Sequence, residues 1–152
     1  MIDVYSKVIK FKARYPMTVA WRLKKHSKII ERHLNQEEEI LYAFCAQKND
    51  NALDIITSCV IVLTNKRILI GQKRVLFGYF FYAITPDMFN DLTVKSGIIW
   101  GRIHIDTIKE IIYLSNIQKD ALSEIEKAIT EYMVREKQKR GLPPEPEKPA
   151  DI

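Results

Sequence analysis

The sequence contains few of the residues that interrupt regular structure. Only five of its 152 residues are glycine and six are proline, and four of those prolines lie in the stretch 143–149. The chain before that stretch is therefore almost free of breakers. Its length and its 47% hydrophobic content predict one globular domain, and we expect 141–152 to be a disordered Pro-rich tail.

Cysteine and histidine are scarce too, and their spacing does not match a set of metal ligands. Cys45 and Cys59 lie on predicted strands, where we expect buried free thiols in a reducing cytoplasm. His26 and His33 lie seven residues apart, and His104 alternates with apolar residues in a strand. We therefore predict no metal and no cofactor.

The motifs of common enzyme classes are also missing. There is no Gly-rich phosphate loop, no His-Glu-x-x-His and no Cys-x-x-Cys, and Ser58 and Ser96 have no nearby His and Asp to activate them. No apolar run approaches the roughly 20 residues that span a bilayer, and the N-terminus does not resemble a secretory signal. These absences favour a cytoplasmic protein without catalytic activity.

Positive charge is concentrated at the N-terminus. Residues 1–35 carry nine Lys or Arg and two acids, whereas the remaining residues carry fifteen Lys or Arg and seventeen acids. The net charge of +5 is thus the sum of +7 and −2. This asymmetry predicts either a segment that meets an acidic partner or a well-solvated helix.

The basic region 1–36 is predicted to form a helical extension before the main domain. Residues 1–15 fit a short amphipathic helix that ends before Pro16, and 17–34 fit a second helix. This pattern is typical of a membrane-interface helix and also of a helix packed on a domain, which is the more common case. The apolar stripe of the second helix is Val19, Leu23, Ser27, Ile30 and Leu34, and its opposite face carries Trp21, Lys24, Lys25, Lys28 and Arg32.

Short apolar runs separated by turn residues predict seven strands in the main domain, 37–140. The clearest pair flanks Thr64-Asn65-Lys66-Arg67, because β-branched residues favour strands. Asn tolerates the left-handed conformation of a tight turn and bonds its own backbone. The predicted strands are 40–47, 53–63, 68–72, 75–84, 89–94, 98–105 and 108–114.

After Ser115 the spacing of apolar residues changes from that of a strand to that of a helix. Ser115 is the expected N-cap, and Gly141 is the expected end. The apolar stripe of this helix is Ile117, Ala121, Leu122, Ile125, Ala128, Ile129 and Tyr132. A partly open barrel of seven strands leaves one end uncovered, and an apolar-faced helix can close it.

Three segments, 38–44, 62–69 and 95–105, resemble a known family. They are similar to the bacterial pleckstrin-homology (PH)-like domains, the YokE-like branch in particular, over roughly residues 37–135. The Leu-Thr-Asn-Lys-Arg hairpin is the most specific match. The resemblance implies a mainly β, α+β fold: a seven-stranded, partly open antiparallel barrel capped by a C-terminal helix and preceded by the N-terminal helices. It also implies a binding module without catalytic residues.

Two surfaces of the chain are candidates for contacts. Cations at hairpin tips and on the N-terminal helix are candidates for contact with an anion or a partner: Lys66, Arg67, Lys73, Arg74, Lys25, Lys28 and Arg32. One face of the aromatic strand 75–84 is a candidate for self-association: Phe77, Tyr79 and Phe81.

These surfaces support three hypotheses. We favour a non-catalytic interaction module that binds a protein partner or forms a homo-oligomer, because a barrel edge can add a strand from another chain. The alternative is peripheral binding to anionic lipid headgroups at the inner membrane face, or to another phosphate ligand. Contact with nucleic acid is disfavoured, because basic and aromatic residues are not interleaved as stacking platforms require.

Overall fold

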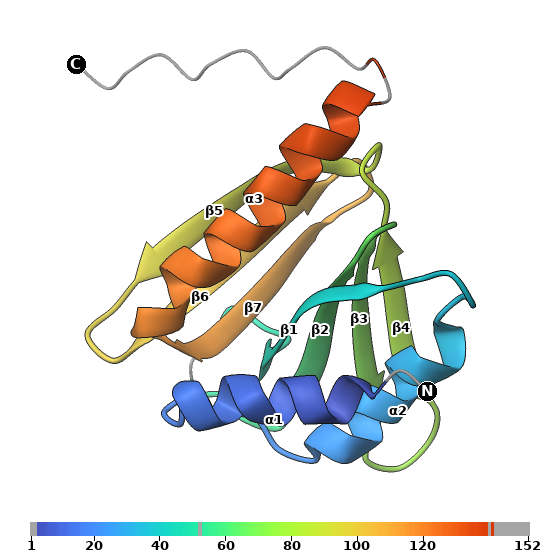
Figure 1. Cartoon of the computed structure of the whole chain (residues 1–152). Coiled ribbons are helices and arrows are strands. Elements are labelled where there is room, and N and C mark those ends of the chain that lie inside the picture. The colour runs from blue at the N-terminus through green and yellow to red at the C-terminus, as the bar shows by residue number, and fades with distance from the viewer. Residues whose placement is uncertain (1–2, 52, 140, 142–152) are drawn as a thin grey trace, which may run out of the picture.

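The apolar runs of the sequence form a seven-stranded antiparallel half-barrel, and three helices pack against it (Figure 1). The computed structural model describes residues 3–51, 53–139 and 141. The strands lie in the order β4-β3-β2-β1-β7-β6-β5, which confirms the predicted mainly β, PH-like architecture. They are β1 (Ile40–Gln47), β2 (Ser58–Thr64), β3 (Ile68–Lys73), β4 (Tyr79–Ile84), β5 (Phe89–Ser96), β6 (Trp100–Thr107) and β7 (Ile111–Gln118).

The half-barrel consists of two groups of strands with a weak junction between them. β1 pairs with β2 along its whole length, but its pairing with β7 is confined to Gln47 and Ser115. β4 and β5 are the two outer strands, and within the described residues neither has a strand on its second side. The barrel is therefore open between β4 and β5.

The C-terminal helix α3 (Leu122–Lys139) lies along β5 and β6 (Figure 1). It begins close against β6, because Gly101 has no side chain and Leu122 packs in the space that one would fill. Glu124 then ties the helix to β1, since its Oε2 accepts a 2.6 Å hydrogen bond from the Tyr42 hydroxyl. The buried side chains of α3 are Leu122, Ile125, Ile129, Tyr132 and Met133. Among the described helices none is long and apolar enough to cross a membrane.

The N-terminal helices α1 (Val4–Arg14) and α2 (Leu23–His33) lie next to each other against β1–β4 (Figure 1). Val8 and Phe11 of α1 and Ile30 of α2 are buried in the same core as the strands. α2 approaches β3 closely at Gly71, where a Cβ atom would lie 2.7 Å from Cγ1 of Ile30. The basic N-terminal region thus contributes to the core of the half-barrel.

The second helix is shorter than its apolar pattern predicts. We expected it to begin near Met17, but it begins at Leu23, because Arg22 adopts a left-handed conformation with φ 53°. The residues before it run as a connection that is held to β7, with the Val19 amide donating to the Asn116 carbonyl. Trp21 therefore lies outside the helix.

Several further predicted element boundaries are wrong. The strands expected to begin at residues 98 and 108 begin at Trp100 and Ile111. Residues 53–57 and 75–78 were expected to be strand, but β2 begins at Ser58 and β4 begins at Tyr79. Ser115 was expected to cap the last helix, but β7 continues to Gln118, because Gln118 still pairs with Trp100 of β6. A 3₁₀ turn, η1 (Lys119–Ala121), then leads into α3.

Candidate functional site

The cations of the two hairpin tips lie at opposite ends of β3. Lys66 and Arg67 precede the strand, Lys73 is its last residue and Arg74 follows it. A six-residue strand is about 20 Å long, so these four side chains do not converge on one pocket. The two hairpin tips are therefore two separate candidate surfaces.

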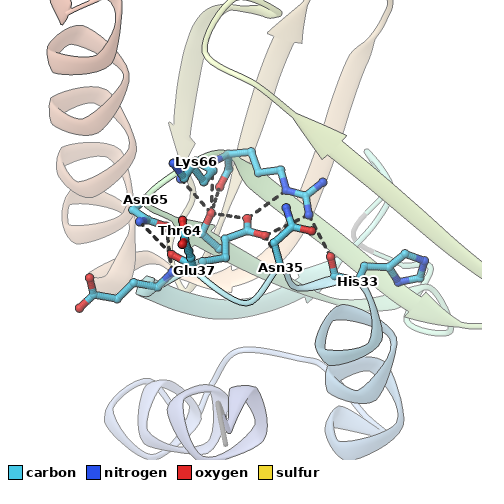
Figure 2. A network of polar contacts seen from close by, with 9 residues as sticks. His33, Asn35, Glu37, Thr64, Asn65 and Lys66 are labelled. Carbon is cyan, nitrogen blue, oxygen red and sulfur yellow. Dashed lines mark hydrogen bonds and ion pairs between the residues drawn. The ribbon is translucent and has the colours of Figure 1, made fainter.

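Arg67 is engaged in a buried ion pair rather than directed at solvent. Its Nε lies 2.9 Å from Oε2 of Glu38 and its Nη2 lies 3.0 Å from Oε1, so the contact is bidentate. The Glu38 side chain is fully buried and that of Arg67 is 19% exposed. The same Nη2 also donates to the carbonyl of His33, the last residue of α2. Figure 2 shows that carbonyl facing the network while the His33 ring points away from it.

The hydrogen-bond donors around Glu38 keep its side chain ionised. Burial alone would raise its pKa, but hydrogen bonds from Arg67, from the Thr64 hydroxyl (2.7 Å) and from the Asn35 amide (3.1 Å) outweigh burial and lower the pKa. The network joins the segment after α2 to the β2–β3 hairpin (Figure 2). Its evident role is to stabilise that junction.

The hairpin turn is built by Thr64 rather than by Asn65. The Thr64 hydroxyl oxygen accepts hydrogen bonds from the amides of Lys66 and Arg67. Asn65 does not have the positive φ that we considered for it, and its Oδ1 accepts from the Glu39 amide at 2.8 Å instead of bonding its own backbone. Lys66 is the exposed residue of this turn.

The cations of α2 form an exposed strip. Lys25, Lys28 and Arg32 are all exposed, whereas Ser27 and Ile30 of the opposite face are buried. This is the orientation that the amphipathic pattern predicts. None of the three cations forms a salt bridge within the described residues.

The three aromatic residues proposed for self-association have different environments. Phe77 lies in the β3–β4 turn and is exposed. Tyr79 opens β4 and is about half exposed. Phe81 is partly covered, because the His33 ring of α2 stacks on it with a centroid distance of 3.9 Å. The exposed part of this face is thus its N-terminal end.

His26 of α2 faces the end of β3. It is buried, and its Nδ1 accepts a 2.8 Å hydrogen bond from the amide of Lys73 at the end of β3. Burial, with a smaller contribution from the Arg22 charge, lowers its pKa to about 4, so the ring is neutral. A neutral, hydrogen-bonded imidazole in this position serves to attach α2 to β3.

The two thiols are free and buried, as expected from the sequence. Burial raises the pKa of Cys45 to about 12 and also raises that of Cys59, so neither is a thiolate nucleophile at neutral pH. Within the described residues no group of three His, Cys, Asp or Glu could hold a metal ion.

Sequence reasoning missed a set of exposed apolar residues. Leu53, Ile56 and Leu76 were assigned to strands, and all three lie in loops with their side chains in solvent. The feature of the sequence that indicates loops here is the neighbouring turn residues, Asn49-Asp50-Asn51 and Lys73-Arg74.

Comparison with known proteins gives one family and several similar structures. A model of the family described as bacterial PH domain matches residues 34–131. A search of curated proteins found no match.

Three solved structures are similar at 14% sequence identity. A pleckstrin homology domain from Shewanella amazonensis has a TM-score of 0.44 and matches over 75% of this chain and 86% of its own. A DUF1696 family protein with a pleckstrin-homology domain from Shewanella loihica has a TM-score of 0.49, with 72% and 92% coverage. The hSac2 domain of the human phosphoinositide phosphatase Sac2 has a TM-score of 0.47, with 86% and 93% coverage.

Proposed function

Since the chain belongs to the bacterial PH domain family, we propose that it is a non-catalytic module that binds a protein partner, and that one such partner is a second copy of itself. The family supports the general class, a binding module. The finer assignment rests on the edge of the half-barrel.

The supporting observation is the open edge of β4. β3 pairs with one side of β4 through all six of its residues, and among the residues that the structure describes no strand lies on the other side. Such an edge accepts a strand from another chain. Exposed Phe77 and Tyr79 stand at its N-terminal end, so pairing of two copies along β4 would remove both rings from water.

Sedimentation equilibrium at micromolar concentration tests this proposal. We expect wild type to sediment as a species larger than the 17.8 kDa chain, because edge pairing buries Phe77 and Tyr79. Phe77→Lys/Tyr79→Lys should be monomeric, since edge charges oppose strand pairing. The matched control is Tyr113→Lys, which alters a partly exposed tyrosine on β7 and should leave the mass unchanged. A monomeric wild type, or an oligomeric edge variant, would contradict self-association through β4.

A second candidate function is weak binding of anionic lipid headgroups, or of another phosphate ligand, by α2. The exposed strip Lys25, Lys28 and Arg32 favours it. Each cation near an anionic surface contributes about 1 kcal/mol at low salt, so binding would be weak and would decline as salt increases. Arg67 does not contribute to this candidate, because its Nε and Nη2 already bond to the Glu38 carboxylate.

We also propose a cytoplasmic location, at the inner membrane face if the second candidate holds. Two free, buried thiols are consistent with a reducing compartment.

A further inference from the structure

A cleft lies between the first helix and the first strand. Its volume is about 430 Å³, and it is lined by Lys7, Lys10 and Arg14 of α1 on one side and by residues 41–43 of β1 on the other. α1 packs against β1 in this part of the molecule (Figure 1). The cleft is separate from the open edge of β4 and from the exposed cations of α2.

Two of the three cations of the cleft are available for a ligand. Lys7 and Lys10 are exposed, and neither forms a salt bridge within the described part of the chain. They are three positions apart on α1, so they lie on one face with their Cβ atoms about 5–6 Å apart. Arg14 is already bonded to Glu124 of α3 through both of its Nη atoms. The available positive charge is therefore that of two neighbouring lysines.

Acidic side chains limit the positive part of the cleft at both ends. At one end the carboxylate of Glu124 lies beside Arg14. At the other end Lys7 also borders a second hollow, which is lined by Asp3 and by the three glutamates of residues 36–40. A long polyanion or a flat anionic surface would be repelled by these acids, whereas a ligand with two carboxylates fits between them.

The strand side of the cleft offers an open edge and an apolar side chain. On the side away from β2, the pairing of β1 is confined to Gln47 and Ser115, so no described strand pairs with residues 41–43 there. Leu41 is skipped in the pairing of β1 with β2, and it is 46% exposed. An irregularity of this kind redirects a side chain, and here Leu41 lines the cleft. An extended peptide can bond to the backbone of such an edge.

We propose that this cleft binds an extended acidic segment of another protein, with two carboxylates two residues apart and an apolar side chain next to them. Side chains two positions apart in an extended chain lie on the same side, about 6.6–6.8 Å apart. The flexible side chains of Lys7 and Lys10 can match that spacing. The apolar side chain of the partner packs on Leu41. Binding of this segment does not depend on self-association through β4.

Titration of the full chain with a short peptide, followed by amide NMR, tests the proposal. The probe is the acetylated and amidated peptide Thr-Glu-Leu-Glu-Thr, and the control is Thr-Gln-Leu-Gln-Thr. We expect the acidic peptide to shift the amide signals of residues 41–43 and of Lys10, and to bind more weakly as salt increases. The glutamine peptide should leave these signals unchanged, because it offers the lysines no charge.

A pair of charge reversals locates the binding site. Lys7→Glu/Lys10→Glu should bind the acidic peptide at least about tenfold more weakly, because two attractive contacts become repulsive. The matched control is Lys24→Glu/Lys109→Glu, which changes the net charge equally at two exposed lysines of α2 and of the β6–β7 turn. It should bind as wild type does.

A second variant leaves the charge of the cleft unchanged. Leu41→Ser should bind about threefold more weakly, because the apolar contact with the peptide is lost. The control is Ile111→Ser, which removes a side chain of similar exposure, 45%, from β7. It should bind as wild type does. Leu41 and Ile111 are both partly in solvent, so both variants should fold.

Three outcomes would overturn the proposal. The first is that millimolar acidic peptide shifts no amide signal of residues 41–43. The second is that the glutamine peptide binds equally well. The third is that Lys24→Glu/Lys109→Glu loses as much affinity as Lys7→Glu/Lys10→Glu, because overall charge would then explain the binding. The sedimenting mass of Lys7→Glu/Lys10→Glu separates this test from self-association, which needs neither lysine and should be unchanged.

Discussion

The two ends of the strands β1–β4 use similar residues in opposite ways. At the β2–β3 end, Arg67 is paired with a buried carboxylate and bonded to the end of α2. At the other end, Arg74 and the apolar residues of the loops are exposed. A Lys-Arg pair at a hairpin tip is therefore not a site by itself, because its role depends on whether the chain supplies a carboxylate. The first end stabilises the fold, and the exposed side chains of the second end are available for contacts with another molecule.

The largest loss of stability is expected from a substitution that breaks the ion pair at the β2–β3 end. Arg67→Met removes the partner of Glu38, whose side chain is fully buried, and leaves a buried carboxylate without its counter-charge. Loss of one member of a buried pair costs about 3–5 kcal/mol. Urea unfolding followed by circular dichroism should show that loss.

The matched control is an arginine with the same bidentate geometry in solvent. Arg14 contacts Glu124 at 2.9 and 3.1 Å, but the two side chains are 53% and 34% exposed. Exposed pairs contribute about 0–1 kcal/mol, so Arg14→Met should be nearly neutral. If the two variants lose equal stability, burial is not what distinguishes Arg67.

The different roles of the two ends explain which parts of the structure could be predicted. The positions of most strands and of the closing helix follow from local patterns, since alternation and helical spacing are properties of short segments. The pairing of Glu38 with Arg67 is not local, because 29 residues separate them. In the sequence, Glu37-Glu38-Glu39 looks like a solvated charge run, and only the fold buries its middle member.

The loops mislead for the opposite reason. Residues 53–57 and 75–78 are rich in large apolar side chains, and apolar runs are expected to be buried strands. Whether a neighbouring element covers them is decided by tertiary structure, which leaves Leu53 and Leu76 in solvent. The start of α2 was missed because Arg22 adopts a left-handed backbone conformation. Arginine rarely adopts this conformation, so nothing in the sequence predicts it there.

A smaller effect is expected from pH, which should weaken the two ends of β1–β4 over different pH ranges. Lowered pKa values at both ends make the folded state bind fewer protons than the unfolded chain, so stability falls as pH decreases. For His26 the loss begins near the ordinary value of 6.5 and continues to about 4. For Glu38 it begins only near 4.5 and continues to lower pH. Mild acid should therefore act on the His26 contact with β3 first.

Unfolding free energies measured at pH 7 and pH 5 test this order. Wild type should lose about 2 kcal/mol over that interval from His26 alone, and His26→Gln should lose correspondingly less. Glu38→Gln should keep the wild-type dependence on pH there, because Glu38 titrates below this window. Equal slopes for wild type and His26→Gln would show that His26 is not the titrating group.

The smallest effect concerns the two central residues of the β2–β3 turn. Asn65→Ala removes the acceptor of the Glu39 amide and should cost about 0.5–1.5 kcal/mol, the usual contribution of one hydrogen bond. Lys66→Ala alters an exposed side chain and should change the free energy of unfolding by less than about 0.5 kcal/mol. The same urea titration compares them. A larger loss of stability for Lys66→Ala would mean that the lysine holds the turn. The expected order would show that Asn65 fixes the hairpin to the segment after α2. Of these two residues, Lys66 is then the one available for contacts outside the chain.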